Sequence, residues 1–271
     1  MEPKGHRRVQ RYGWDKAVDS YDRYFLPLIS HCSERAIAML ALEPGERVLD
    51  VATGTGVGAF MLADGVGPSG EVVATDISEK MVEAVRAEAE RRGVLNMRYE
   101  RADAEELAFP DGSFDALACV LGLMYPADPP QAIEQMYRVL RPGGRAAAAV
   151  WGRRDRCGWN SIFPITDARV NSDVCPLFFA LGAPGALRYA FEKAGFAVED
   201  EQRIDKSVDF ANENDMIAAM FTGGPVALAY SRFEPQVRDE VHAEFIESVS
   251  DYRRDDGYDI PGEFVFILGR K

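Results

Sequence analysis

Short apolar runs alternate with longer amphipathic stretches through the first half of the chain. We expect strands at 47–50, 71–75, 97–101, 114–121 and 145–151, with helices between them. Most of these runs are nearly continuous in apolar residues, as strands are when helices cover both faces of a parallel sheet. The pattern therefore predicts an α/β fold in which the carboxyl ends of the strands meet at one crevice.

Two segments flank this alternating part. Residues 12–42 are predicted to form two helices that separate at Pro27. After Trp151 the alternation breaks, and residues 153–182 carry aromatic side chains between prolines and glycines. The remainder is expected to hold a helix at 186–194, a strand near 196–199 paired with 202–209, helical segments at about 213–231 and 235–252, and an edge or hairpin strand at 263–269. No repeat or low-complexity linker divides the chain, so a single domain over residues 1–271 is expected.

The run from Arg47 to Gly58 carries the clearest chemistry. It is expected to form a strand that ends at Asp50, a turn containing Gly54 and Gly56, and the start of a helix. Glycine has no Cβ, so backbone in such a turn comes close to a ligand, and the new helix offers free N–H groups. The next strand ends at Asp76, twenty residues after Gly56, where a carboxylate accepts hydrogen bonds from a ribose. These features predict a cofactor that carries adenosine.

Composition narrows the classes of partner. The 271 residues have a formal net charge of −13, which disfavours nucleic acid and anionic membrane surfaces because both require clustered Lys and Arg. The four cysteines show no metal-ligand spacing, so neither a metal site nor a disulfide framework is expected. The chain shows no signal-like start and no apolar run of membrane length, so we expect a cytoplasmic location without membrane insertion. The expected partner is a small molecule, and a monomer or homodimer is anticipated.

The glycine turn followed by Asp76 also fits a nicotinamide fingerprint. A short-chain-type NAD(P)-dependent oxidoreductase would need a catalytic Tyr-x-x-x-Lys. The two such pairs fall before the first strand (Tyr12 and Lys16) and on the helix at 186–194 (Tyr189 and Lys193). The oxidoreductase is therefore kept as an alternative.

Five segments, which begin at Asp50, Asp76, Asp103, Ser113 and Arg138, resemble the motifs of class I S-adenosylmethionine (SAM) methyltransferases in order and spacing. The run 109–125 is similar to the small-molecule group that includes the ubiquinone/menaquinone enzymes (methyltransferase type 11). The resemblance covers roughly residues 12–151, and it implies a Rossmann-like, doubly wound, mostly parallel seven-stranded sheet with a helical cap over the substrate site. It further implies an N-terminal helical lid (12–42), a cofactor-binding core (43–152), a substrate-facing segment (153–271) and a place in secondary metabolism.

The resemblance also assigns residues to the cofactor SAM and its product S-adenosylhomocysteine. Gly54 and Gly56 would lie against the methionine part, Asp50 near its ammonium group, Asp76 on the ribose, and Asp103 on the adenine amine. Glycine is frequent in the family where Ala52 stands. The full set implied to bind the cofactor is Asp50, Ala52, Thr53, Gly54, Thr55, Gly56, Asp76, Ile77, Met81, Asp103, Ala104, Glu105, Val120 and Leu121.

An apolar or aromatic acceptor, methylated at oxygen or carbon, is expected because positive charge disperses during methyl transfer. The residues expected to contact it are Tyr21, Tyr24, Met124, Tyr125, Trp151, Trp159, Phe163 and Phe178. His31 is the candidate general base, with the weaker candidates Asp155, Asp167 and Asp173, whereas His6 is expected in an N-terminal tail.

Two alternatives concern the acceptor and the reaction. Cys32, Cys157 and Cys175 would together hold arsenite or another thiophilic acceptor, as in an arsenite or thiol methyltransferase. The fold also occurs in proteins that bind SAM without transferring a methyl group, as regulatory or pericyclase-like modules.

Overall fold

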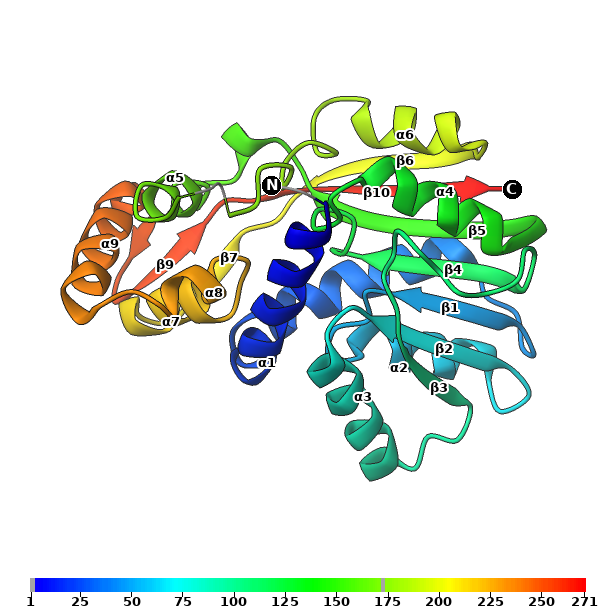
Figure 1. Ribbon diagram of the computed structural model, residues 1–271. Helices are drawn as coiled ribbons and strands as arrows, with labels where there is room; N and C mark the ends of the chain where they lie inside the picture. The colour runs from blue at the N-terminus through cyan, green and yellow to red at the C-terminus, as the bar shows by residue number, and fades with distance from the viewer. Residues whose placement is uncertain (1–2, 172–173) are drawn as a thin grey trace.

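A seven-stranded sheet forms the centre of the protein, as the computed structural model shows for residues 3–171 and 174–271 (Figure 1). The strand order is β3-β2-β1-β4-β5-β10-β6, and β10 alone runs antiparallel to its neighbours. This arrangement confirms the predicted Rossmann-like, mostly parallel sheet. The strands are β1 (Arg47–Val51), β2 (Glu71–Asp76), β3 (Met97–Arg101), β4 (Phe114–Val120), β5 (Leu140–Trp151), β6 (Ala197–Asp205) and β10 (Glu263–Arg270).

Helices cover both faces of the sheet because the chain reverses its direction of winding after β3. Right-handed crossovers from β1 through β3 and from β4 to β5 place their helices on opposite faces. The long helix α1 contacts α2 and α3, whereas α4 and α6 lie together on the other side (Figure 1). These helices are α1 (Pro3–Leu40), α2 (Val57–Val66), α3 (Glu79–Arg92), α4 (Pro129–Val139) and α6 (Ala186–Ala194).

The predicted break at Pro27 is wrong, because α1 is one helix of 38 residues that passes through this proline. Pro27 is exposed, so the backbone carbonyl that loses its N–H partner can bind water instead. Leu28, Cys32, Ala36 and Leu40 recur every four residues and are buried, which holds the second half of α1 against the core. The first half leaves the sheet and stands between it and the cap (Figure 1).

The C-terminal strands also differ from the prediction. The expected strand pair is a single strand, β6, and the expected edge strand, β10, lies between β5 and β6. Phe264, Val265, Phe266 and Ile267 are all completely buried, as an interior strand requires. The polar β6 takes the edge instead, where charged side chains disfavour pairing with another chain.

The cap contains helices and a second sheet, rather than helices alone. A three-stranded sheet in the order β7-β9-β8 joins the helices at the end of the molecule away from the C-terminus (Figure 1). The cap elements are α5 (Ile162–Asp167), β7 (Val208–Phe210), α7 (Glu213–Thr222), α8 (Ala227–Tyr230), α9 (Pro235–Ser248), β8 (Arg253–Arg254) and β9 (Gly257–Ile260). Across the described ranges, no helix combines the length and the apolar character needed to cross a membrane.

Candidate functional site

A cavity lies where β1, β2 and β4 end, beneath the first half of α1. It spans about 710 Å³ of empty space, part of which is open to solvent. Its position at the carboxyl ends of parallel strands is where α/β sheets bind ligands. It is lined by His6, Arg7, Gln10, Trp14, Tyr21, Ala52, Gly54, Asp76, Ile77, Met81, Ala102, Asp103, Ala104, Glu105, Val120, Leu121, Gly122, Tyr125, Pro126 and Ala127.

The floor of this cavity is the turn after β1. Ala52, Gly54 and Gly56 all have positive φ, at 58°, 56° and 95°. A Cβ on Gly56 would lie 2.2 Å from Cγ2 of Val85, so only glycine fits at the start of α2. At Gly54 the turn presents bare backbone to the cavity, against the ring of Tyr21. A ligand can therefore approach the backbone closely at this point.

Asp76 is positioned by two backbone N–H groups. Its Oδ2 accepts from Gly54 at 3.0 Å, and its Oδ1 accepts from Ser78 at 2.9 Å. Burial raises the pKa of the carboxyl to about 6, although these hydrogen bonds oppose the rise. Asp76 still lines the cavity, and each carboxylate oxygen has a further lone pair, so it can accept hydroxyl donors from a ligand.

Asp50 lies behind the turn and does not line the cavity among the described residues. Its Oδ2 accepts the hydroxyl of Thr53 at 2.7 Å, and this hydrogen bond favours the ionised carboxylate, whereas burial favours the protonated form. Burial and the nearby charge of Asp76 raise the pKa of Asp50 to about 7. A cationic group near the turn would lower that pKa by favouring the ionised form.

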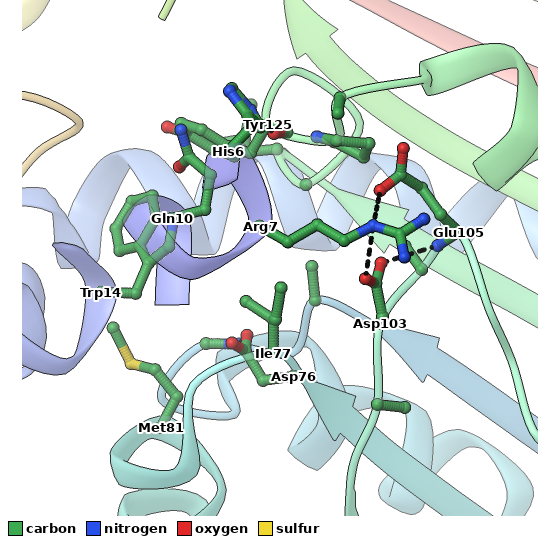
Figure 2. Close-up of a pocket in the computed structure, with 18 of the residues that line it drawn as sticks. His6, Arg7, Gln10, Trp14, Asp76, Ile77, Met81, Asp103, Glu105 and Tyr125 are labelled. Carbon is green, nitrogen blue, oxygen red and sulfur yellow. Dashed lines mark hydrogen bonds and ion pairs between the residues drawn. The ribbon is translucent and has the colours of Figure 1, made fainter. Parts of the chain in front are cut away.

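The far end of the cavity has apolar walls and a carboxylate pair. Ile77 and Met81 lie below Arg7, which reaches from α1 toward Asp103 and Glu105 (Figure 2). The Arg7 Nε is 2.7 Å from Oε2 of Glu105 and 3.1 Å from Oδ2 of Asp103. The first turns of α1 thus close this end of the cavity with an ion pair.

A second cavity adjoins the first and is much more apolar. It spans about 570 Å³ of empty space, part of which is open to solvent, and extends under the cap. Trp14, Tyr21, Leu121 and Tyr125 line both cavities and form the boundary between them. The other lining residues are Phe25, Leu28, Ile29, Trp151, Trp159, Ile162, Phe178, Val208, Met220, Gly223, Gly224 and Pro225.

Most of the residues singled out from the sequence line one of the two cavities, but three expected acceptor contacts do not. Phe163 stands behind the wall, with its ring 4.9 Å from that of Phe178. The Met124 sulfur accepts the backbone N–H of Trp151 at 3.3 Å, and Tyr24 is also absent from both linings.

The remaining cofactor residues support the turn from behind. Thr53 donates its backbone N–H to the Thr75 carbonyl at 2.8 Å, and the Thr55 hydroxyl bonds to Asp22 of α1. Gly56 lies at the base of α2 rather than in either lining.

The candidate bases that the structure describes are not brought to the cavities. His31 lies outside both linings, and its Nε2 is buried without a hydrogen-bond partner in the described part of the chain. Asp155 pairs with Arg153 at the surface, and Asp167 accepts the backbone N–H of Val174 at 2.8 Å. Asp173 lies outside the described residues. The geometry therefore gives no support to His31, Asp155 or Asp167 as the general base.

The described residues do not assemble the side chains that the two alternative chemistries would need. Tyr12 and Tyr189 are largely exposed, and neither Tyr-x-x-x-Lys pair lines either cavity. Over residues 3–171 and 174–271, no three His, Cys, Asp or Glu side chains gather as a metal or arsenite site would require. Burial raises the pKa of the Cys157 and Cys175 thiols to about 12, which makes them poor ligands and nucleophiles.

The first turns of α1 supply His6, Arg7 and Gln10, which the sequence did not reveal as site residues. His6 is helical rather than part of a tail, and its Nε2 donates to the carbonyl oxygen of Tyr125 at 2.8 Å. Arg7, Gln10 and Trp14 follow it into the first cavity (Figure 2). Their spacing of three to four residues was a usable signal, because such residues share one face of a helix.

Comparison with known proteins finds similarity to methyltransferases. A family model described as a methyltransferase domain matches residues 48–144, which contain the turn and the ends of β1, β2 and β4. Demethylmenaquinone methyltransferase of Thermus thermophilus is 34% identical over 181 residues, which cover 62% of this chain and 81% of the relative. Nocamycin O-methyltransferase of Saccharothrix syringae is 28% identical over 251 residues, with 88% and 89% coverage.

Other matches are partial in length or limited to the fold. The chain spans 65% of the length of demethylmenaquinone methyltransferase from Listeria welshimeri, with 33% identity over 154 residues that make up 55% of this chain. A crystal structure of a Bacillus halodurans protein assigned as a methyltransferase aligns with a TM-score of 0.64 and 22% identity. This alignment covers 88% of this chain and 98% of the other, and it shows a shared fold.

Proposed function

The chain belongs to the class I SAM-dependent methyltransferases, and from this premise we propose that it methylates a small, largely apolar or aromatic acceptor at oxygen or carbon. One observation carries the proposal: two adjoining cavities share a boundary formed by Trp14, Tyr21, Leu121 and Tyr125. The first has the polar features of a nucleoside site and the second is apolar. A methyl group would cross the boundary between them.

The residues of the first cavity fit SAM. Asp76 retains free lone pairs for ribose hydroxyls, and Gly54 leaves the turn open to the methionine part. Ile77 and Met81 provide apolar surface for adenine, and Asp103 offers a carboxylate to its amine. Asp50, buried behind the turn with few donors of its own, is suited to the cofactor's ammonium group, directly or through water.

The cofactor supplies an electrophilic methyl group on a positively charged sulfur. The protein's contribution is alignment and exclusion of water, which can provide a large part of the rate enhancement in such a displacement. α1 encloses both cavities through contacts at either end, by Arg7 on the carboxylate pair and by Phe25, Leu28 and Ile29 along the second cavity. We therefore assign α1 the role of a lid over the reacting groups.

The acceptor class follows from the lining of the second cavity. Trp151, Trp159 and Phe178 form part of its wall, with the Trp151 and Trp159 rings 4.7 Å apart. Such a wall binds apolar or aromatic surface and offers little to a highly charged molecule. The relatives named demethylmenaquinone methyltransferase and nocamycin O-methyltransferase agree with an acceptor of this kind.

Transfer of labelled methyl groups tests the proposal. The protein would be incubated with methyl-labelled SAM and a fractionated metabolite extract, beside an Asp76→Ala variant as a control impaired in cofactor binding. We expect a labelled apolar product that depends on Asp76. Tight binding of S-adenosylhomocysteine without any labelled product would favour a fold that binds SAM without transferring methyl. Binding of NADH instead would refute the assignment of the cavity.

A further inference from the structure

The second cavity, from here called the acceptor cavity, has no side chain suited to removing a proton. Among its described lining residues there is no Asp, Glu, His, Lys or Arg. Its polar side-chain atoms belong to tyrosines and tryptophans. Indole N–H groups only donate hydrogen bonds, and a neutral phenol donates readily but is a very weak base. The wall therefore supplies donors to a bound molecule.

The two tyrosines of the boundary stay neutral. Burial raises the pKa of Tyr21 well above its ordinary value, and the carboxylates of Asp22 and Asp76 add to the rise. Burial raises the pKa of Tyr125 in the same way, reinforced by Tyr21. Neither hydroxyl can act as a phenolate base at neutral pH.

Asp76 in the lining of the first cavity and Asp50 behind its turn are two buried carboxylates of this region. Asp76 is held by the backbone of Gly54 and Ser78, and Asp50 by the hydroxyl of Thr53. Neither lines the acceptor cavity. A proton on the acceptor therefore has no carboxylate partner within this cavity.

Trp159 adds a positive reason for a particular acceptor. It lines the acceptor cavity, its side chain is held between Trp151 and Phe178, and only 4% of the residue is exposed. Its Nε1–H has no hydrogen-bond partner in the described part of the chain. A buried N–H without an acceptor is costly, so a bound molecule that supplies an acceptor atom there gains affinity.

We propose that the acceptor enters this cavity already ionised, as the anion of an acidic phenol or enol, and that Trp159 selects it by donating its indole N–H to the anionic oxygen. This inference rests on the proposed function and narrows its substrate class. The proton leaves to water before binding. In the transfer a lone pair of the anion forms the new bond to the methyl carbon, and the pair of the broken carbon–sulfur bond remains on sulfur as a thioether.

An anionic acceptor in this cavity would be stabilised by two groups, the sulfonium of the cofactor and the indole N–H of Trp159. An isolated anion in an apolar cavity is strongly disfavoured unless it is paired and hydrogen-bonded. The sulfonium group of the cofactor supplies the opposite charge at the boundary, and Trp159 supplies a hydrogen bond. Because a bond to a charged acceptor is stronger than one to a neutral acceptor, the N–H discriminates in favour of the anion.

Binding of two matched probes tests the inference without requiring turnover. The first, 4-nitro-1-naphthol, is ionised at neutral pH, and the second, 1-nitronaphthalene, has the same rings but no hydroxyl. Each would be titrated calorimetrically into the protein saturated with S-adenosylhomocysteine. We expect the naphtholate to bind at least tenfold more tightly than 1-nitronaphthalene. Trp159→Phe should lose roughly tenfold or more in affinity for the naphtholate, the effect of one hydrogen bond to a charged group, and little for 1-nitronaphthalene.

Trp151→Phe is the matched control, because Trp151 lines the same cavity and packs against Trp159. It should change the affinity for both probes by similar factors. Equal affinity of the native protein for the two probes, an equal loss for both in Trp159→Phe, or binding of neither probe would overturn the inference. Failure of the proposed function would show earlier, as absence of S-adenosylhomocysteine binding or of any labelled product, so the two failures are distinguishable.

Discussion

Two buried carboxylates, Asp50 behind the turn and Asp76 in the lining of the first cavity, are expected to make cofactor affinity depend on pH. In the free protein the pKa of Asp50 is about 7 and that of Asp76 is about 6, both raised chiefly by burial. At pH 5 both groups therefore hold protons. A cationic ammonium near Asp50 and ribose hydroxyls on Asp76 both favour the ionised forms, so the cofactor displaces protons when it binds. We expect affinity for S-adenosylhomocysteine to increase as the pH is raised.

The size of the effect follows from the pKa of Asp50. For each proton released, affinity changes about tenfold per pH unit below the pKa of the free protein, or about 1.4 kcal/mol. Between about pH 5 and about pH 7, release from Asp50 alone gives an increase of roughly 30- to 100-fold. Partial release of a proton from Asp76 would further increase the affinity in the lower half of this pH range.

Calorimetric titration in two buffers of different ionisation enthalpy measures both the affinity and the number of protons released. Asp50→Asn, which cannot ionise, should bind more weakly at pH 7 and show a flatter profile. Affinity that is the same at pH 5 and pH 7, with no proton release by the native protein, would refute the placement of the ammonium group and ribose beside these carboxylates.

Four further results are expected. Asp76→Ala should weaken S-adenosylhomocysteine binding by roughly 1–3 kcal/mol, and unchanged calorimetric affinity in a folded variant would remove Asp76 from the site. Arg7→Ala opens the ion pair that closes the adenine end, so dissociation of S-adenosylhomocysteine should accelerate severalfold in stopped-flow fluorescence, and an unchanged rate would argue against a latch. Ala52→Gly removes a side chain from a left-handed backbone position and should raise the free energy of unfolding, measured in urea, by up to about 1 kcal/mol. Gly122→Ala places a Cβ 2.5 Å from the Cβ of Ala52 and should lower the free energy of unfolding by about 1–3 kcal/mol. This loss should be smaller when Gly122→Ala is combined with Ala52→Gly. Because the raised pKa of Asp50 favours its protonated form, the free protein should lose thermal stability as the pH rises from about 4 to about 7, and a Tm that rises over this range would contradict the sign.

The turn after β1 and the strand ends beside it were predictable because their signals are local. The glycines of the turn, Asp50 and Asp76 are fixed by backbone conformation and by strand ends within one β-α-β unit. Even the departure at Ala52 has a physical reading, since its φ of 58° is the conformation for which glycine is favoured. These residues follow one another in the sequence in the same order as the strands and the turn that carry them.

The closure by α1, the order of the C-terminal strands and the lining of the second cavity depend on contacts between distant segments, which the sequence pattern did not show. Arg7 meets Glu105 across 98 residues, and β10 inserts between two strands that precede it by many residues. The sequence offered His31 as a base and Trp159 as an acceptor contact, yet tertiary packing leaves the former outside both cavities and sets the latter in the wall. Helix α1 runs through Pro27 because packing outweighs the local signal for a break.

A crystal structure with bound S-adenosylhomocysteine tests the central claim most directly, that two adjoining cavities hold the cofactor and the acceptor. We expect the ribose to be hydrogen-bonded to Asp76 and the adenine to lie between Arg7 and Met81. The thioether sulfur should lie at the boundary formed by Tyr21 and Leu121 and face the apolar cavity. Density for the nucleoside elsewhere, or a sulfur directed away from that boundary, would contradict it.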